Sequence, residues 1–327
     1  MAFWSGYWKS LKPLPVEEPI DVWLHRPLGY VLARVCLLTP ISPNAITVGS
    51  MLLGVACGVS FAAHFPWHLQ VGGLCLVLSA VFDCADGQLA RLRGTSSPFG
   101  RMLDGTADLI VVVAFVAGTF WVLLERHWEP AWLRYPLIAA LVVTAVTSSF
   151  HTTMFDHFKN VFLCMTVRGH ADAEDFETAA ARHRERTARD LTVAARFSWP
   201  IYLFYVKSQQ DYMRRFDPYT APRLSALPPF DEERARIYRK HAECVLGVWR
   251  RWMGPGSLAF AAAVVAAFDV MEWYLLFRLV GLNALFYGYV RGAQRRASRE
   301  AFREMNVTFE ETAATGLRRS CACLDDG

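Results

Sequence analysis

Four aspartates stand in two closely spaced pairs. Asp83 and Asp86 are three residues apart, and Asp104 and Asp108 are four residues apart. On an α-helix both spacings put the two carboxylates on one face. If the chain folds back between the pairs, the four negative charges meet. Such a cluster needs cations, and hard divalent ions such as Mg²⁺ or Mn²⁺ prefer oxygen ligands. Two such ions would balance the four carboxylates, as in many phosphoryl-transfer sites.

Small residues accompany both pairs. Gly87 and Ala90 follow the first pair on its helix face, and Gly100 lies one turn before Asp104. These positions leave room for a flat ligand against the backbone. Arg91 is one turn after Gly87, where its guanidinium group could reach phosphate oxygens. Taken singly, the glycines also suit helix packing in a membrane, and Arg91 also suits a positive-inside anchor.

The elements that position these residues are predicted to be membrane-spanning helices. The chain has 327 residues, of which 54% are hydrophobic and 20% charged. Its long apolar runs alternate with charged stretches, as in an all-α polytopic membrane protein. The composition excludes a disordered chain, a secreted disulfide scaffold and a small basic nucleic-acid module, so we expect no nucleic-acid partner. Six spans are predicted, over residues 45–66, 69–91, 104–125, 135–156, 252–270 and 272–291.

Charges in the loops predict the orientation of these spans. The turn 64–70 has no Lys or Arg, whereas the loop 92–103 and the long insert 157–251 carry several. Because positive charge favours the cytoplasmic side, both termini and both loops are predicted to be cytoplasmic. The aspartate pairs, at the ends of spans two and three, would then lie at the cytoplasmic face of an integral membrane protein.

The regions outside the spans are predicted to be helical as well. Residues 19–38 mix apolar side chains with Asp21, His25, Arg26 and Arg34, which favours an amphipathic helix at the membrane interface over a seventh span. The insert is expected to hold surface helices over residues 177–196 and 231–239, and its aromatic stretch 197–205 suits a contact with the membrane interface. The predicted organisation is a cytoplasmic N-terminus with interfacial helix (1–44), spans one to four with the active site (45–156), a cytoplasmic or interfacial helical insert (157–251), spans five and six (252–291) and a cytoplasmic tail (292–327).

The spacing of the site residues resembles a known family. The pattern Asp83-x-x-Asp86-Gly87-x-x-Ala90-Arg91, eight residues, Gly100, three residues, Asp104, three residues, Asp108 matches every position of the CDP-alcohol phosphotransferase signature. The stretch Ser-Pro-Asn-Ala-Ile-Thr over residues 42–47 is similar to the Pro-Asn-x-x-Thr start of the family's first span. The six-span layout fits too. The resemblance does not extend to the insert or the tail.

This resemblance implies a reaction and roles for the residues. Such enzymes transfer a substituted phosphate from a CDP-linked donor to an alcohol hydroxyl and release CMP. The resemblance makes Asp83, Asp86 and Asp104 ligands of two Mg²⁺ or Mn²⁺ ions, with Asp108 contributing and also acting as general base. It assigns the nucleotide to Gly87, Ala90, Arg91 and Gly100, with Asn44 and Thr47 lining the same pocket. It also implies a homodimer formed through the membrane helices.

The donor and acceptor stay open at this point. The interfacial helix before a Pro-Asn entry resembles the arrangement in family members that transfer a head group to a diacylglycerol-type lipid. This resemblance favours a CDP-linked head group as donor and a lipid as acceptor. The alternative is CDP-diacylglycerol with inositol phosphate, glycerol phosphate or serine. A phosphorylated acceptor would need basic residues, for which Arg93, Arg101, Lys159 and Arg168 are candidates, although ordinary positive-inside charge explains them better. A divalent-cation transporter is the alternative of another class, and the position of the acids at span ends argues against it.

Overall fold

In the part of the chain that the computed structural model describes, all regular secondary structure is helical. The structure describes residues 6–8, 10–11, 13–95, 98–129, 131–168, 207, 211–213, 215–217, 219, 227–228 and 230–307, with the backbone alone at 98, 99, 101 and 102. The chain divides into two compact units, drawn from residues 1–152 with 250–284 and from residues 153–249 with 285–327. The predicted helix over residues 177–196 and the predicted interfacial contact of residues 197–205 lie outside the described residues.

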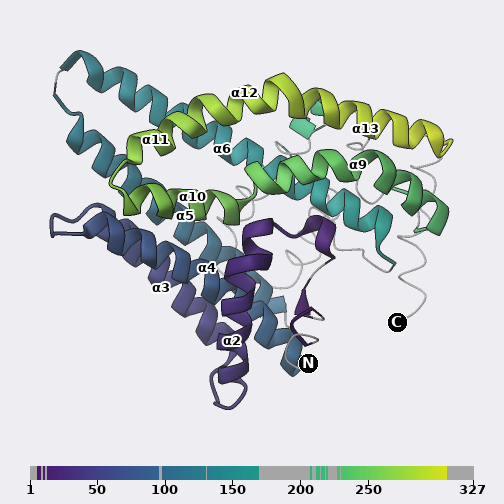
Figure 1. Ribbon diagram of the computed structural model, residues 1–327, viewed down its shortest axis with the longest axis horizontal. Helices are drawn as coiled ribbons and strands as arrows, with labels where there is room; N and C mark the ends of the chain where they lie inside the picture. Colours follow the sequence, from purple (N-terminus) through teal and green to yellow (C-terminus); the bar gives the residue numbers. More distant parts are fainter. Residues whose placement is uncertain are drawn as a thin grey trace, which may run out of the picture. The chain divides into compact units, whose positions relative to one another are not determined.

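The first unit holds the predicted site. Two short turns, η1 (Leu14–Val16) and η2 (Asp21–His25), precede its longer helices. These are α2 (Arg26–Cys36), α3 (Pro43–Phe61), α4 (His68–Arg93), α5 (Pro98–Arg126), the first part of α6 (Ala131–Thr166), α10 (Pro255–Ala267) and α11 (Met271–Leu276), with the turn η4 (Phe277–Leu282) after them. Helix α3 packs against α4 and α5, and α4 also contacts α2 and α10 (Figure 1).

The second unit contains the remaining described helices. It takes in the carboxyl-terminal part of α6, most of α9 (Glu232–Trp252), η5 (Phe286–Val290) and α13 (Arg291–Glu304), with α12 (Asn283–Leu285) at the boundary between the units. Helix α9 contains the helical stretch predicted for residues 231–239, apart from its first residue. Helix α6 runs ten residues beyond the predicted end of span four at residue 156, and residues of this extension, such as Phe158 and Phe162, are buried.

Four of the six predicted spans are supported by the structure. Helices Pro43–Phe61, His68–Arg93 and Ala131–Thr166, together with Leu103–Arg126 of α5, are long and apolar enough to cross a bilayer. The fifth and sixth spans are not confirmed. Helix α10 has 13 residues, because a break at Gly254 and Pro255 separates it from α9 and a turn at Asp269, with φ of 59°, follows it. Residues 271–290 alternate between α and π turns, with no α-helix longer than six residues.

The positions at which α4 ends and α5 begins determine where the two aspartate pairs lie. The Ser42 hydroxyl accepts the backbone N–H of Ala45 and Pro43 occupies the first turn, so α3 begins at the predicted motif. Helix α4 ends at Gly94, whose φ of 65° is the left-handed conformation that glycine tolerates. The chain then turns back into α5. Asp83 and Asp86 therefore stand near the end of α4, and Asp104 and Asp108 near the start of α5.

Close backbone contact between α3 and α5 depends on glycine. A Cβ atom at Gly58 would collide with the backbone carbonyl of Ala114, and one at Gly118 would collide with the carbonyl of Gly58. Small residues at such crossings let membrane helices approach each other. This contact fixes where α5, and with it the second aspartate pair, runs beside α3.

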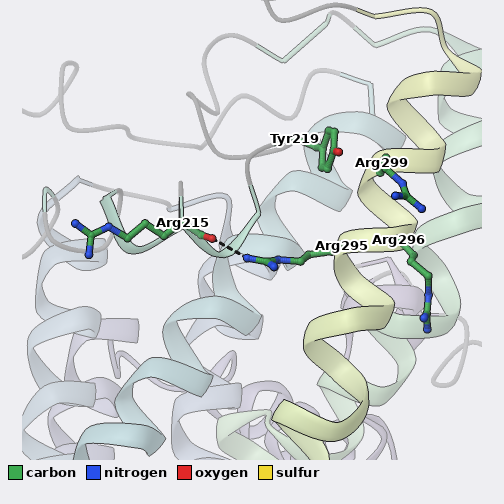
Figure 2. A pocket seen from close by; sticks show the side chains of 5 residues that line it. All are labelled: Arg215, Tyr219, Arg295, Arg296 and Arg299. Carbon is green, nitrogen blue, oxygen red and sulfur yellow. Dashed lines mark hydrogen bonds between the residues drawn. The ribbon is translucent and has the colours of Figure 1, made fainter.

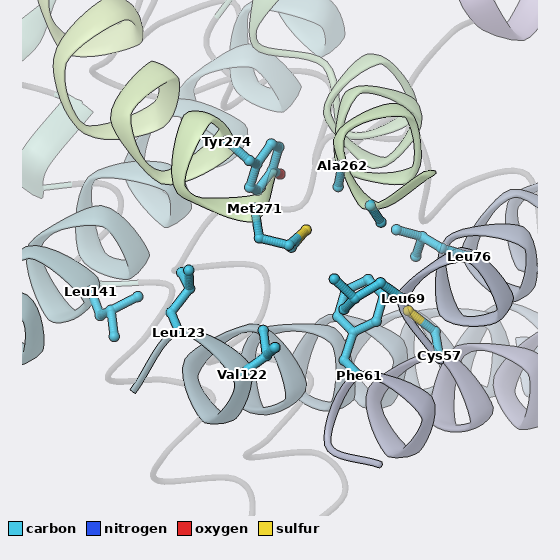
Figure 3. Close-up of a cluster of buried hydrophobic side chains, with 11 residues drawn as sticks. Cys57, Phe61, Leu69, Leu76, Val122, Leu123, Leu141, Ala262, Met271 and Tyr274 are labelled. Carbon is cyan, nitrogen blue, oxygen red and sulfur yellow. The ribbon is translucent and has the colours of Figure 1, made fainter. Parts of the chain in front are cut away.

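A buried apolar cluster holds the rest of the unit together. Its side chains come from α3, α4, α5, α6, α10 and α11 (Figure 3). They are Cys57, Phe61, Leu69, Leu76, Val122, Leu123, Leu141, Ala262, Ala266, Met271 and Tyr274. Its members on α4 and α5 do not include any of the four aspartates. Apolar packing therefore holds these two helices, and the segments that carry the aspartates are not part of this core.

Helix α2 lies within the predicted N-terminal interfacial segment. Gly29, Tyr30 and Ala33 are buried in the unit, whereas Val31 and Val35 are exposed. Apolar side chains that face away from the protein suit a helix in contact with lipid. Its location at the interface remains a prediction.

Candidate active site

Three of the four predicted aspartates come together in the structure. Asp83 on α4 and Asp104 and Asp108 on α5 each offer one carboxylate oxygen, and these oxygens lie within 4.8 Å of one another. Asp83 and Asp104 are half-buried, and Asp108 is exposed. We call these three residues the aspartate cluster. The separate spacings on two helices therefore produce one group of carboxylates, as the fold-back between α4 and α5 predicts.

Asp86 has a different neighbour. It is buried beside α3, where its carboxylate lies 2.5 Å from the Thr47 hydroxyl. That hydroxyl also lies 3.2 Å from the carbonyl oxygen of Pro43, and because it has one proton it donates to one of these oxygens at a time. Asp86 does not belong to the group of oxygens within 4.8 Å. The predicted metal ligand Asp86 and the predicted nucleotide residue Thr47 thus contact each other.

The residues predicted to bind the nucleotide lie on the helical turns next to the aspartates. A Cβ atom at Gly87 would lie 3.5 Å from Nη1 of Arg91, so this guanidinium group covers the bare face of Gly87. Ala90 and Asn44 are half-buried, on α4 and in the first turn of α3. Gly100 is half-buried in the first turn of α5. The structure thus pairs Gly87 with Arg91 as their spacing predicts.

The chemistry of the aspartate cluster suits a metal ion. All three donors are carboxylate oxygens, the ligand type that hard divalent cations prefer. Three carboxylates this close together repel one another unless a cation or a proton neutralises part of their charge. The structure therefore contains an aspartate cluster that could hold a metal ion.

A glutamine beside the site fastens the N-terminal segment to α4. The Gln88 side chain is completely buried, and its amide nitrogen lies 3.2 Å from both the Ser10 hydroxyl and the carbonyl oxygen of Arg26. Gln88 sits between Asp86 and Leu89 on the helix that carries the first pair. Our interpretation of the sequence did not single it out, although an amide inside an apolar span is a signal of a buried polar contact.

Arg93 has a structural role. Its guanidinium group donates to the carbonyl oxygens of Cys36, Thr39 and Ile41 at 2.7, 2.8 and 2.6 Å. These oxygens belong to the end of α2 and the chain that leads to α3. Arg93 therefore fixes the path between the N-terminal helix and the first predicted span.

Two of the other candidate acceptor-binding residues also have protein partners. Lys159 forms an ion pair with Asp156 at 2.8 Å, and the Arg168 guanidinium carbon lies 5.8 Å from the ring centre of Phe230. The side chain of Arg101 lies outside the described residues. Contacts within the protein therefore account for Arg93, Lys159 and Arg168.

A buried carboxylate of the N-terminal segment binds the start of α10. Glu18 is 5% exposed and accepts the backbone N–H groups of Ser257 and Gly256 at 2.7 and 3.3 Å. A Cβ atom at Gly254 would collide with this carboxylate, so glycine makes room for it. The pKa of Glu18 is raised to about 7, chiefly by burial and then by the nearby Asp21 carboxylate, while the hydrogen bonds from Ser257 and Gly256 oppose the rise.

Comparison with known proteins identifies the domain that carries the site. Residues 40–165 match the family model described as CDP-alcohol phosphatidyltransferase. This range includes all four aspartates and the first turns of α3. The segment is a CDP-alcohol phosphatidyltransferase domain, and the predicted family is confirmed over it.

Three curated relatives illustrate the breadth of the similarity. A phosphatidylinositol phosphate synthase of Mycobacteroides abscessus is 32% identical over 36% of this chain and 50% of its own length. A cholinephosphotransferase of Gallus gallus is 31% identical over 36% of each chain. A bifunctional IPC transferase and DIPP synthase of Aquifex aeolicus is 30% identical over 36% of this chain and 26% of its own length. The matched regions thus cover half of these relatives' length or less.

Proposed function

We propose that the protein is a membrane phosphotransferase that moves a substituted phosphate from a CDP-linked alcohol to a hydroxyl group and releases CMP. The observation that carries this proposal is the aspartate cluster, whose carboxylate oxygens lie within 4.8 Å of one another inside the segment that matches the family. The product would be a phospholipid or a related lipid.

The carboxylates divide between two tasks in this proposal. Asp83, Asp104 and Asp108, together with Asp86, would hold two divalent cations, Mg²⁺ or Mn²⁺. When bound, these ions would neutralise the charge of the donor pyrophosphate and of the leaving CMP. Asp86 would contribute through the carboxylate that Thr47 orients at 2.5 Å.

Asp108 is proposed as the general base. It is the exposed member of the aspartate cluster and lies one helical turn from Asp104, so an acceptor hydroxyl can reach it. As Asp108 takes the hydroxyl proton, the hydroxyl oxygen bonds to the phosphorus that bears the alcohol. The bond between that phosphorus and the bridging oxygen breaks, and CMP leaves with the bridging oxygen.

The neighbouring turns are proposed to bind the nucleotide. Gly87, Ala90 and Gly100 offer little side-chain bulk, and Arg91 would donate to the phosphates. The position of the Arg91 guanidinium group over Gly87 supports this pairing. Asn44 and Thr47 would border the same pocket from the first turns of α3.

A CDP-linked head group as donor and a lipid as acceptor is the favoured specificity. Arg93 and Lys159, two candidates to bind a phosphorylated acceptor, are engaged with backbone carbonyls and with Asp156. The relatives' names include both a cholinephosphotransferase and a phosphatidylinositol phosphate synthase, so the competing CDP-diacylglycerol donor belongs in the same test. The protein is further proposed to span the membrane six times as a homodimer, with both termini and the site on the cytoplasmic side.

A panel of donors and acceptors tests the proposal. The purified full chain is given radiolabelled CDP-choline, CDP-ethanolamine or CDP-diacylglycerol with diacylglycerol, inositol phosphate, glycerol phosphate or serine, and CMP release is measured with Mg²⁺, with Mn²⁺ or with EDTA. We expect one pair to react, EDTA to abolish turnover, and Asp108→Asn to lower it at least about a hundredfold. Asp156→Asn, which removes an exposed carboxylate of α6, is the matched control and should retain turnover.

Two results would contradict this assignment. Full turnover by Asp108→Asn with metal present would refute the base. Transport of Mg²⁺ into liposomes by a protein that releases no CMP with any donor would favour the cation transporter instead.

A further inference from the structure

An arginine-rich cavity lies within the second unit. It has a volume of about 290 Å³ and is lined by Arg215, Tyr219, Arg295, Arg296 and Arg299. Figure 2 shows the three α13 arginines opposite the segment that carries Arg215 and Tyr219. We call this cavity the arginine pocket. It shares no residue with the aspartate cluster.

Buried hydrogen bonds shape one wall of the arginine pocket. The Ser298 hydroxyl donates to Asp217 at 2.5 Å, and both side chains are almost completely buried. Asp217 also accepts the backbone N–H of Tyr219 at 3.0 Å. Arg295 donates to the carbonyl oxygens of Phe216 and Arg215 at 2.5 and 2.7 Å, and the latter contact is drawn in Figure 2. Arg215, Phe216 and Asp217 are thereby held against α13, and Tyr219 is linked to it through Asp217.

Charges are segregated around α13. At about 100° per residue, its five arginines fall within an arc of about 140°. They are Arg291, Arg295, Arg296, Arg299 and Arg303. The acids lie outside this arc and face α9, where Glu304 pairs with Lys240 and His241, and Glu300 with His241. Like charges at such spacings destabilise a helix, which favours a bound anion at the basic face.

Three of the four arginines that line the pocket lie at the surface. Arg215, Arg296 and Arg299 are exposed, and no carboxylate pairs with them within the part of the chain that the structure describes. In Figure 2, Tyr219 and Arg299 lie above the Arg295 contact, while Arg215 and Arg296 extend outward from it. Arg295 is half-buried and already donates to carbonyl oxygens, so the exposed arginines Arg299, Arg296 and Arg215 are the groups that a ligand would meet.

We propose that the arginine pocket binds the phosphate of an anionic phospholipid head group. Helix α13 continues directly from η5, the end of the predicted sixth span, and basic clusters next to a span attract anionic lipids. Guanidinium groups bind phosphate oxygens with paired hydrogen bonds. The volume is close to the lower limit for small-ligand pockets, which suits a head group.

Lipid binding by the metal-free full chain tests this proposal separately from catalysis. The protein is purified in a non-ionic detergent with EDTA, and calorimetry measures binding of dihexanoyl phosphatidic acid, dihexanoyl phosphatidylcholine and inorganic phosphate. We expect saturable binding of phosphatidic acid that weakens at least about fivefold in Arg299→Gln and at least about twentyfold in Arg296→Gln/Arg299→Gln. Arg291→Gln removes the same charge beside the span but outside the pocket, and should change affinity less than twofold.

The controls distinguish a specific binding site from general electrostatic attraction between arginines and anionic lipid. Circular dichroism and elution volume verify that each variant is folded. Equal weakening by Arg291→Gln, or binding by the double variant within twofold of the unmodified chain, would overturn the proposal. Inorganic phosphate that binds as tightly as phosphatidic acid, with the same dependence on Arg296 and Arg299, would refute the lipid assignment. Saturable binding of phosphatidylcholine of similar strength would refute anion recognition.

Discussion

The buried carboxylate of Glu18 predicts how stability depends on pH. Burial raises its pKa from 4.5 to about 7 in the folded chain. The folded state therefore binds the proton more tightly than the unfolded state does. Between pH 4.5 and about 7 the folded state keeps a proton that the unfolded state has lost, so the free energy of unfolding falls as the pH rises. Below 4.5 and above about 7 this contribution is constant.

The size of this change in the free energy of unfolding follows from the shift in the pKa of Glu18. A difference of about 2.5 pKa units corresponds to a loss of about 3 kcal/mol by pH 8, at about 1.4 kcal/mol per unit. Glu18→Gln removes the titration but keeps a carbonyl oxygen that can accept the N–H of Ser257. The variant should therefore be stabilised relative to the unmodified protein above pH 7, and the difference should shrink toward pH 5.

Thermal unfolding in detergent between pH 5 and 8 measures this difference. Glu233→Gln, an exposed carboxylate at the start of α9, is the control and should follow the pH profile of the unmodified chain. Asp21→Asn should reduce the pH dependence, because the Asp21 carboxylate raises the pKa of Glu18. A stability difference between Glu18→Gln and the unmodified chain that is the same at pH 5 and pH 8 would refute the reasoning.

Two further predictions concern the helices around the site. Thr47→Val removes the hydroxyl that donates to Asp86, and leaving a buried acceptor unpaired costs about 1–3 kcal/mol. Half-maximal CMP release should therefore need about tenfold more Mg²⁺, and Thr47→Ser should restore the original requirement. An unchanged Mg²⁺ requirement in Thr47→Val would contradict the role given to this hydrogen bond. Gly58→Ala places a methyl group against the Ala114 carbonyl and should cost about 1–3 kcal/mol, measured as a lower melting temperature, whereas Gly288→Ala meets no atom within 4 Å and should be neutral. Equal melting temperatures of the two glycine variants would show that α3 and α5 do not touch as closely as described.

The spacing of polar residues predicted much of the site. All four aspartates were expected in one group because pairs at helical spacing near a chain reversal face each other. The oxygens of Asp83, Asp104 and Asp108 do lie together, whereas Asp86 contacts Thr47 on α3. Four of the predicted spans followed from apolar runs longer than the bilayer requires. A span over residues 252–270 was expected from hydropathy, which does not indicate whether a helix is continuous. The chain breaks at Gly254, and the helix that follows has only 13 residues.

Periodicity by itself determined which residues share a helix face, because that depends only on rotation along the chain. Contacts between distant residues depended on tertiary packing. Thr47 and Asp86 are 39 residues apart, and Glu18 and Ser257 are 239 apart, yet the first pair forms a buried hydrogen bond and the second a part-buried one. Arg93 likewise donates to carbonyls more than 50 residues away. Each of these partners was decided by which helices lie side by side, since a polar group taken out of water bonds to whatever donor or acceptor the packing brings within reach.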